Sequence, residues 1–396
     1  MVTEITEPVK SIYLHIPFCR RRCFYCDFAI ATGGQDLKAR YVEAICQEIA
    51  LTAAQVAIAN RHPLQTIFFG GGTPTLLDAR QITTILEAIT RNFGIAAEVE
   101  ISLEANPGTV TLESLQGYKA AGVNRVSLGA QAFQLELLDL SGRGHGVDEI
   151  YVAVEAISLA GITNFSLDLI SGLPNQDMHQ WQDSLTQAIA LQPTHISVYD
   201  LTIEPGTAFG KRYQAGDRPL PSEATTVDMY LLAHAQLQDA GYEHYEISNY
   251  ARPGYQCRHN LVYWHNRPFY GVGMGATSYT EKCRIDRPRK LRDYFQTIDA
   301  WRDRGIVPTA PPCSPNAELL DTLMQGLRLA EGISLNKLRQ NYGDALVSTV
   351  LNCLQPYFQK GWAKSADDRQ AHLMLAIPDG WLFSNEVIAD LFVALE

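Results

Sequence analysis

The chain has 396 residues, of which 46% are hydrophobic and 19% are charged. This balance is typical of globular proteins, and the length predicts one large domain and one smaller one. The net charge of −11 argues against a general binder of nucleic acid or of anionic membranes, so no nucleic-acid partner is expected.

The sequence also indicates where the protein works. No apolar run approaches the ~20 residues that span a bilayer, which predicts no transmembrane segment. The acidic stretch MVTEITEPVK at the N-terminus lacks the apolar region of a secretory signal. Eight cysteines in so long a chain do not look like a disulfide framework. We therefore expect a cytoplasmic protein in which clustered thiols are metal ligands.

Short β-rich runs and helical patterns alternate over the first 250 residues. The β-rich runs are nearly continuous in apolar residues, as in parallel strands buried on both faces, and they cover 11–16, 65–70, 98–105, 124–129, 164–170 and 194–201. Gly122, Gly161 and Gly241 each follow a helical stretch, where a left-handed cap is favoured. Six such units predict an α/β fold, a partial (β/α)6 TIM-like barrel. A seventh β-rich run covers 242–250 and no eighth unit follows, so we expect an open barrel.

Three domains are predicted: the barrel over 1–250, an elaborated connector over 251–312, and a helical domain over 313–396. The last domain ends in a predicted hairpin over 372–383, around Pro378 and Gly380, and therefore looks like a winged helix. Winged helices often bind DNA, but this domain has six Lys and Arg against ten Asp and Glu. Its charge favours packing or partner docking.

Three cysteines directly follow the first predicted strand, in the stretch HIPFCRRRCFYCDF. Cys19, Cys23 and Cys26 have the spacing C-x3-C-x2-C, at the end of the strand where barrel active sites lie. Three thiolates would ligate three irons of a [4Fe–4S] cluster and leave the fourth iron open to a small molecule. The alternative is a structural zinc site completed by His15, Asp27 or Cys46, although no second C-x-x-C is present.

Polar or flexible residues also end the next four predicted strands. Gly71 and Gly72 lie in FFGGGTPTLL, where glycines let the backbone approach a ligand, although an ordinary tight turn would have the same sequence. Glu104, Gln131 and Asp168 lie at or near the ends of the strands that follow. Each alone is more often a solvated side chain, but several on successive strands of one barrel predict a common site.

Together, HIPFCxxxCxYC, GGGTPT, the Glu104 and Gln131 strands and DLISGLP resemble the radical S-adenosylmethionine proteins, and more narrowly the oxygen-independent coproporphyrinogen III oxidase group. The resemblance covers nearly the whole chain. It implies that Cys19, Cys23 and Cys26 hold a [4Fe–4S] cluster and that S-adenosylmethionine fills the open coordination position. The residues that it implies as contacts of S-adenosylmethionine are Tyr13, Tyr25, Gly71, Gly72, Thr73, Glu104, Gln131, Arg143, Asp168, Thr202 and Tyr279.

Two departures from the oxidase pattern and one addition favour another function. The oxidase pattern resembles C-x3-C-x2-C-x-C, but Phe28 occupies its last position here, and only 18 residues precede Cys19. The stretch CRHNLVYW adds His259, Asn260, Tyr263 and Trp264, a motif that resembles the haem-chaperone branch of the group. A single histidine near aromatics is more often a packed residue, but an imidazole can ligate haem iron and the aromatic rings can pack on the porphyrin.

We therefore expect a chaperone that binds haem and transfers it to acceptor proteins, with the oxidase as the alternative and no oxidase activity anticipated.

Arg20, Arg21 and Arg22 lie between the first two cluster cysteines, and they could attract an acidic electron donor or form a solvated loop face. The basic run over 282–292 could pair with haem propionates but is more typical of a solvated segment. Cys257, two residues before His259, stays a candidate beside the motif.

Overall fold

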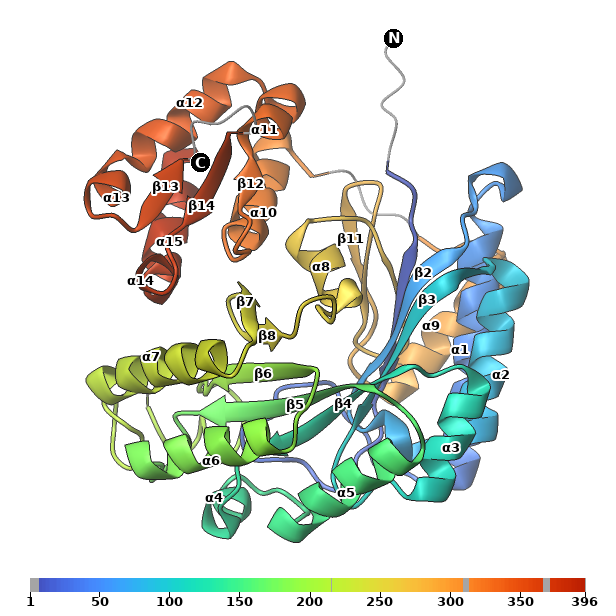
Figure 1. Ribbon diagram of the computed structural model, residues 1–396. Helices are drawn as coiled ribbons and strands as arrows, with labels where there is room; N and C mark the ends of the chain where they lie inside the picture. The colour runs from blue at the N-terminus through green and yellow to red at the C-terminus, as the bar shows by residue number, and fades with distance from the viewer. Residues whose placement is uncertain (1–6, 215, 309–312, 366–370, 396) are drawn as a thin grey trace.

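The computed structural model describes residues 7–214, 216–308, 313–365 and 371–395. Six parallel strands occur in the order of the sequence, as predicted (Figure 1). They are β1 (Ser11–Ile16), β2 (Leu64–Gly71), β3 (Ile95–Ala105), β4 (Arg125–Gln131), β5 (Asn164–Ser171) and β6 (His195–Asp200). The helices that alternate with them lie on the outer face of the curved sheet. They are α1 (Gln35–Ala54), α2 (Ala79–Asn92), α3 (Leu112–Ala121), α4 (Leu135–Leu140), α5 (Val147–Leu159), α6 (Met178–Ala190) and α7 (Glu223–Asp239).

The predicted helix ends agree with the structure where glycine was expected to cap them. Gly122, Gly161 and Gly241 have φ angles of 113°, 72° and 84°, in the left-handed region that side chains disfavour. The glycine loop after β2 contains a short 3-10 helix, η2 (Pro74–Leu76), and another, η1 (Ile58–Asn60), precedes β2.

The two faces of the sheet differ in chemistry, which the apolar strand patterns did not reveal. Side chains on the outer face, such as Leu14, Phe69 and Leu167, belong to the main hydrophobic core beneath the helices. Side chains on the inner face are largely polar, and they include Tyr13, His15, Ser102, Glu104, Arg125, Ser127, Ser166, Asp168, His195 and Ser197. The inner face is therefore equipped to bind a ligand rather than to fill a core.

The sheet is open, because different elements pair with its two outer parallel strands. On β6 lies a hairpin of β7 (Glu243–Glu246) and β8 (Asn249–Ala251), which accounts for the seventh β-rich run. On β1 lies β9 (Tyr270–Val272), a parallel strand that the sequence did not predict. The segment between these edges contains α8 (Arg258–Trp264), which packs against β2.

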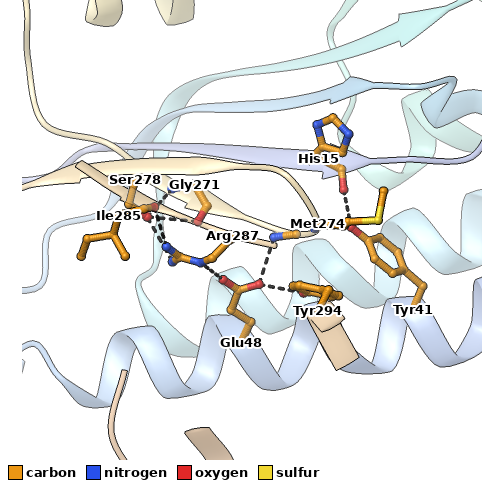
Figure 2. A network of polar contacts seen from close by, with 10 residues as sticks. His15, Tyr41, Glu48, Gly271, Met274, Ser278, Ile285, Arg287 and Tyr294 are labelled. Carbon is orange, nitrogen blue, oxygen red and sulfur yellow. Dashed lines mark hydrogen bonds and ion pairs between the residues drawn. The ribbon is translucent and has the colours of Figure 1, made fainter. Parts of the chain in front are cut away.

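A buried network of polar side chains attaches the connector to the barrel (Figure 2). Glu48 of α1 forms an ion pair with Arg287 at 2.6 Å, and both side chains are buried. The other carboxylate oxygen of Glu48 accepts hydrogen bonds from the Gly273 backbone at 2.9 Å and from the Tyr294 hydroxyl at 2.7 Å. The connector also contains β10 (Thr277–Thr280), β11 (Cys283–Asp286) and α9 (Leu291–Arg304), which packs beside α1.

Tyr41 of α1 extends this network from the connector to β1 through two hydrogen bonds. The Tyr41 hydroxyl donates to the carbonyl oxygen of His15 at 2.7 Å and accepts from the Met274 backbone at 2.8 Å. His15 in turn lies just before the loop that contains Cys19, Cys23 and Cys26, called the cysteine loop below, so the network fixes the connector and the end of β1 together (Figure 2).

The C-terminal segment has its own hydrophobic core and a three-stranded antiparallel sheet. Its elements are α10 (Pro315–Gly326), β12 (Ile333–Ser334), α11 (Leu335–Tyr342), α12 (Asp344–Cys353), α13 (Gln355–Gln359), β13 (Ala363–Ser365), β14 (His372–Leu375), α14 (Asp379–Leu382) and α15 (Ser384–Leu395). The hairpin predicted over 372–383 is wrong. Strand β14 pairs with β13, which precedes it, and Gly380 lies inside α14, where a Cβ would meet the Trp362 carbonyl at 2.1 Å.

Main-chain hydrogen bonds join this segment to the barrel. Ile247 donates to the carbonyl of Arg328, and Ala330 donates to the carbonyl of Tyr245, both at 3.0 Å. The domain boundaries at 250 and 312 remain a prediction. Within the described ranges, no helix is long and apolar enough to cross a membrane.

Candidate functional site

The cysteine loop occupies the carboxyl end of β1. Its base is closed by two backbone hydrogen bonds, from Cys19 to Ala31 at 3.0 Å and from Ala31 to Pro17 at 2.8 Å. Cys19, Cys23 and Cys26 are all half-buried free thiols, and burial raises the pKa of Cys19 to about 11. A metal would therefore have to displace the proton of the Cys19 thiol on binding.

The side chains considered as a fourth zinc ligand are engaged elsewhere. His15 places Nε2 at 2.7 Å from the Ala29 carbonyl, Asp27 pairs with Arg289, and the Cys46 thiol faces the Thr84 carbonyl at 3.8 Å. In the described part of the chain, no three His, Cys, Asp or Glu residues are placed to hold a single metal ion.

The glycine loop after β2 lies against the cysteine loop. Gly71 has a φ of 108°, and a Cβ there would lie 2.6 Å from the His15 ring. A Cβ on Gly72 would lie 2.7 Å from the backbone of Pro17 and Phe18. The Thr73 hydroxyl is 3.7 Å from the sulfur of Cys19. The glycines are therefore required for the close approach of the two loops, which an ordinary turn would not need.

Arg143 joins the cysteine loop to β3 and β4. Its Nη1 lies 3.5 Å from the Cys23 sulfur and 3.3 Å from the Tyr25 hydroxyl, and its Nη2 donates to the Gly129 carbonyl at 2.7 Å. Nη2 also donates to the Asn106 side chain, whose amide nitrogen donates to the Thr73 hydroxyl at 2.8 Å. Asn106 was missed as a site residue, although it directly follows the strand that ends in Glu104 and Ala105.

Two carboxylates lie on the inner face near this edge. Glu104 accepts a hydrogen bond from the Gly71 backbone at 2.9 Å, and burial together with the charge of Asp168 raises its pKa to about 7. Asp168 accepts hydrogen bonds from Ser127 at 3.0 Å and from Ser166 at 3.1 Å, and burial raises its pKa. The serines were missed, but their alternation with apolar residues in β4 and β5 is the signal that could have revealed them.

Three further residues predicted to contact the cofactor, Gln131, Thr202 and Tyr279, differ in burial and position. Gln131 is buried at the end of β4 with a φ of 70°, a strained conformation for a residue with a side chain. Thr202 is exposed just after β6. Tyr279 lies on β10, where its ring packs against Phe269 and Arg284, so the structure does not bring it to the cysteine loop. Tyr25, in contrast, lies within the cysteine loop beside Arg143, and Tyr13 of β1 contacts His15.

The HNxxYW motif forms α8, which packs near the start of β2. His259 is 1% exposed, and both of its ring nitrogens have partners at 2.8 Å: the Thr66 hydroxyl at Nδ1 and the Tyr263 hydroxyl at Nε2. Burial lowers the pKa of His259 to about 3, and Arg125 adds to this effect, so the ring is neutral. Asn260 and Trp264 are half-buried on the same helix.

Aromatic rings lie between this motif and the cysteine loop. The Phe68 ring stacks on His259 at 5.1 Å between ring centroids and on Tyr13 at 6.2 Å. The Tyr13 hydroxyl is 3.1 Å from His15 Nδ1. The two predicted sites thus share the inner face of β1 and β2.

Glu100 of β3, missed from the sequence, holds α8 in place. Its two carboxylate oxygens accept hydrogen bonds from the backbone N–H groups of Arg258 at 3.2 Å and of His259 at 3.1 Å. The thiol of Cys257 also lies 3.8 Å from a carboxylate oxygen of Glu100. Cys257 is therefore close to the motif because it lies beside the carboxylate that caps the start of α8. A carboxylate at a helix N-terminus satisfies orphan N–H groups that would otherwise be buried.

Most arginines of the two basic segments, 20–22 and 282–292, form ion pairs or hydrogen bonds. Arg284 pairs with Asp321, Arg287 with Glu48 and Arg289 with Asp27. Arg20 and Arg22 donate to carbonyls of Gly108 and Phe28, but they stay exposed beside the cysteine loop, as does Arg21.

Comparisons with known proteins identify the fold and the relatives. The model of the Radical SAM superfamily matches residues 13–188, which include the cysteine loop, the glycine loop, most of β1 and all of β2 to β5. The solved structure of coproporphyrinogen III oxidase (HemN) from Escherichia coli, described as a radical SAM enzyme, superposes with a TM-score of 0.82 at 24% identity. That likeness covers 98% of this chain and 90% of that one.

Relatives with curated names identify the protein family more narrowly than the fold does. The protein named heme chaperone HemW of Synechocystis sp. is 45% identical over 98% of this chain and 97% of its own length. The protein of the same name from Escherichia coli is 43% identical over 68% of this chain and 70% of its own, and that from Bacillus subtilis is 33% identical over 96% and 98%. The chain therefore belongs to the family of proteins named heme chaperone HemW, and its residues 13–188 match the radical SAM superfamily.

Proposed function

We propose that this chain is a haem chaperone, which binds haem and transfers it to acceptor proteins. The observation that carries this proposal is the 45% identity, over nearly the full length of both chains, to a protein named heme chaperone HemW. The HNxxYW helix on the inner face of the sheet supports it, because it places an imidazole among aromatic rings.

We propose further that the chain holds a [4Fe–4S] cluster and S-adenosylmethionine. Cys19, Cys23 and Cys26 would ligate the cluster, and the residues that would hold S-adenosylmethionine are Tyr13, Tyr25, Gly71, Gly72, Thr73, Glu104, Gln131, Arg143 and Asp168. When bound, such a cluster can supply an electron to the sulfonium of S-adenosylmethionine. The donor set fits a zwitterionic ligand, since backbone, carboxylate and guanidinium groups converge beside the cysteine loop.

Three side chains orient or charge the proposed S-adenosylmethionine site. Glu104 fixes the Gly71 amide, and the Thr73 hydroxyl lies beside the Cys19 sulfur. Arg143 offers a positive charge near Cys23 and has an Nε without a hydrogen-bond partner among the described residues. A buried donor without a partner is costly, so it favours a ligand with acceptor oxygens.

His259, Asn260, Tyr263 and Trp264 would bind the haem. Because both nitrogens of His259 are engaged, iron could bond to Nε2 only after the Tyr263 hydroxyl has moved away. A haem titration followed by absorption spectroscopy tests this assignment. His259→Ala should weaken binding, whereas His265→Ala, a change at a half-buried histidine directly after α8, should leave it unchanged. Equal binding by the two variants would refute the motif assignment.

Transfer to acceptors needs its own test. Haem-loaded protein mixed with excess apomyoglobin gives the passive rate of haem loss. An acceptor that draws haem from the chain through contact should exceed this rate in proportion to its own concentration. If every acceptor candidate only matches the passive rate, the chain stores haem and does not deliver it.

No coproporphyrinogen III oxidase activity is expected, because Phe28 stands where the oxidase pattern has its fourth cysteine, and its side chain is 62% exposed. Anaerobic incubation with coproporphyrinogen III, S-adenosylmethionine and a reductant should give no doubly decarboxylated product. A parallel sample must show an intact cluster by spectroscopy. Product formed over many turnovers would establish the enzyme instead.

The cluster loop also suggests a partner. Arg20, Arg21 and Arg22 are exposed around it, and they would attract an acidic electron donor. Cluster reduction by such a donor should slow when all three are replaced by Gln, and the slowing should vanish at high salt. We keep the cytoplasm as the proposed compartment, since free thiols of this kind persist in a reducing environment.

A further inference from the structure

Arg125 of β4 is a buried cation without a direct partner. It is 2% exposed, its Nε has no hydrogen-bond partner in the described ranges, and it forms no ion pair with any described carboxylate. Ser102 of β3 lies beside it in register, is fully buried, and likewise has a hydroxyl without a partner. Two unsatisfied polar groups side by side on the inner face are costly unless a ligand uses them.

The acidic groups near Arg125 are already engaged. Glu100 uses both oxygens on the N–H groups at the start of α8, and Asp168 accepts from Ser127 and Ser166. Burial opposes the charge of Arg125, but Cys257, Glu100, Tyr245 and Asp168 outweigh it and raise the pKa, so the guanidinium stays protonated. A buried guanidinium is therefore available to a further anionic oxygen.

Arg125 lies close to the haem motif. Phe68 on β2 neighbours Ser102 on β3, which neighbours Arg125 on β4, and Phe68 stacks on His259. The backbones of β2 and β4 are two strand spacings apart, or roughly 9–10 Å. The guanidinium and the imidazole thus lie on the same face of the sheet, and the charge of Arg125 contributes to the lowered pKa of His259.

We propose that Arg125 and Ser102 bind the carboxylate of a haem propionate, and so orient the haem whose iron faces His259. This inference rests on the proposed haem binding and adds residues and a ligand group to it. Guanidinium and carboxylate form two parallel charge-assisted hydrogen bonds, which fix orientation as well as affinity. The basic run over 282–292 serves this purpose less well, because Arg284, Arg287 and Arg289 already pair with carboxylates.

Haem and haem dimethyl ester, titrated in the same detergent, test the proposal. The ester keeps the iron and the ring but has no free carboxylate. The wild type should bind haem about 10-fold or more tightly than the ester, the scale of a hydrogen bond to a charged group. Arg125→Met should bring this ratio close to one, and Arg125→Lys should leave an intermediate ratio, because lysine keeps the charge and loses the fork. Arg289→Met, at a 62% exposed arginine, is the control and should keep the wild-type ratio.

Each outcome decides between the two proposals. If the wild type binds neither compound, haem binding itself fails. Equal binding of both compounds by the wild type leaves haem binding intact and overturns the propionate site. A wild-type ratio that persists in a folded Arg125→Met protein, with folding checked by thermal unfolding, places the anchor elsewhere. If acetate raises the melting temperature of the wild type but not of Arg125→Met, and the haem ratio is one, the site takes small free carboxylates and the propionate assignment is wrong.

Discussion

The Nε2 atom of His259 lies 2.8 Å from the hydroxyl oxygen of Tyr263, one turn further along α8. Because Thr66 holds the other ring nitrogen at the same distance, the imidazole is fixed in one orientation. The Tyr263 hydroxyl thus occupies the nitrogen of His259 through which haem iron would bind, and both residues belong to the same motif. If haem iron binds at Nε2, as proposed, this nitrogen would have to exchange its bond to the hydroxyl for a bond to the metal.

Tyr263→Phe tests this protection. Phenylalanine keeps the ring that packs against Phe269 but removes the hydroxyl, so Nε2 becomes free. Haem affinity should rise about five-fold, the worth of one ordinary hydrogen bond. Tyr279→Phe, in the same aromatic cluster, should have no effect. If Tyr263→Phe binds haem more weakly than the wild type, the hydroxyl contributes to the haem site instead of competing with it.

The ion pair of Glu48 and Arg287 should dominate the stability of the connector. Glu48→Gln leaves Arg287 buried without a countercharge, which costs about 3–5 kcal/mol in free energy of unfolding. Urea titration measures this. Glu87→Gln, in the exposed pair with Arg91, is the matched control and should cost about 0.3–0.5 kcal/mol. Similar losses in both variants would mean that the buried network does not hold the connector.

Glu246, at the junction with the C-terminal segment, should make stability depend on pH. It is fully buried, neither of its carboxylate oxygens has a hydrogen-bond partner within the described ranges, and burial raises its pKa from 4.5 to about 8. The folded state therefore keeps a proton that the unfolded state loses, so the stabilising effect is full below about pH 4.5 and is lost as the pH rises to 8.

Glu246→Gln mimics the protonated side chain, so it should match the wild type near pH 5 and exceed its stability near pH 8. The difference should grow by up to about 1.4 kcal/mol per pH unit across this window. Urea midpoints of both proteins at several pH values measure it. Glu243→Gln, at an exposed position of the same strand, should give a constant difference. A constant difference for Glu246→Gln as well would show that the carboxyl titrates normally.

The cluster assignment predicts a simple analytical result. Cys23→Ser, reconstituted without oxygen, should lose most of the four irons and the sulfide that a [4Fe–4S] cluster brings. Cys46→Ser should retain them, because the Cys46 thiol faces a carbonyl on the helical layer. Equal loss in both variants would make Cys46 a ligand.

The parallel strands and their helices could be predicted from the sequence because both depend on local patterns. Apolar strands, glycine caps and the spacing of Cys19, Cys23 and Cys26 lie within short windows. The groups that orient these residues were harder to find. Arg143 and Asn106 meet the cysteine and glycine loops only through the pairing of β1 to β4, and Glu100 meets α8 across 158 residues.

Two features were misread for identifiable reasons. Pro378 and Gly380 look like a turn, but Gly380 is needed for the close approach to the Trp362 carbonyl at the start of a helix. The apolar strands concealed a polar inner face, because isolated residues such as Ser102 and Arg125 resemble exceptions within an apolar run. In an open barrel, alternate positions of parallel strands face the ligand side, where polar groups are useful.

All three thiols proposed to ligate the cluster lie in one short loop, and this has a consequence for the protein as it is made. Cys23 and Arg143, which touch in the folded chain, are 120 positions apart. At about 5–20 residues per second, a ribosome takes roughly 6–24 s to add that stretch. During this time the thiols are outside the ribosome without their cover. Oxygen present during translation should therefore damage the protein more than the same exposure after folding, and iron and sulfide for the proposed cluster would be able to reach the thiols on the nascent chain.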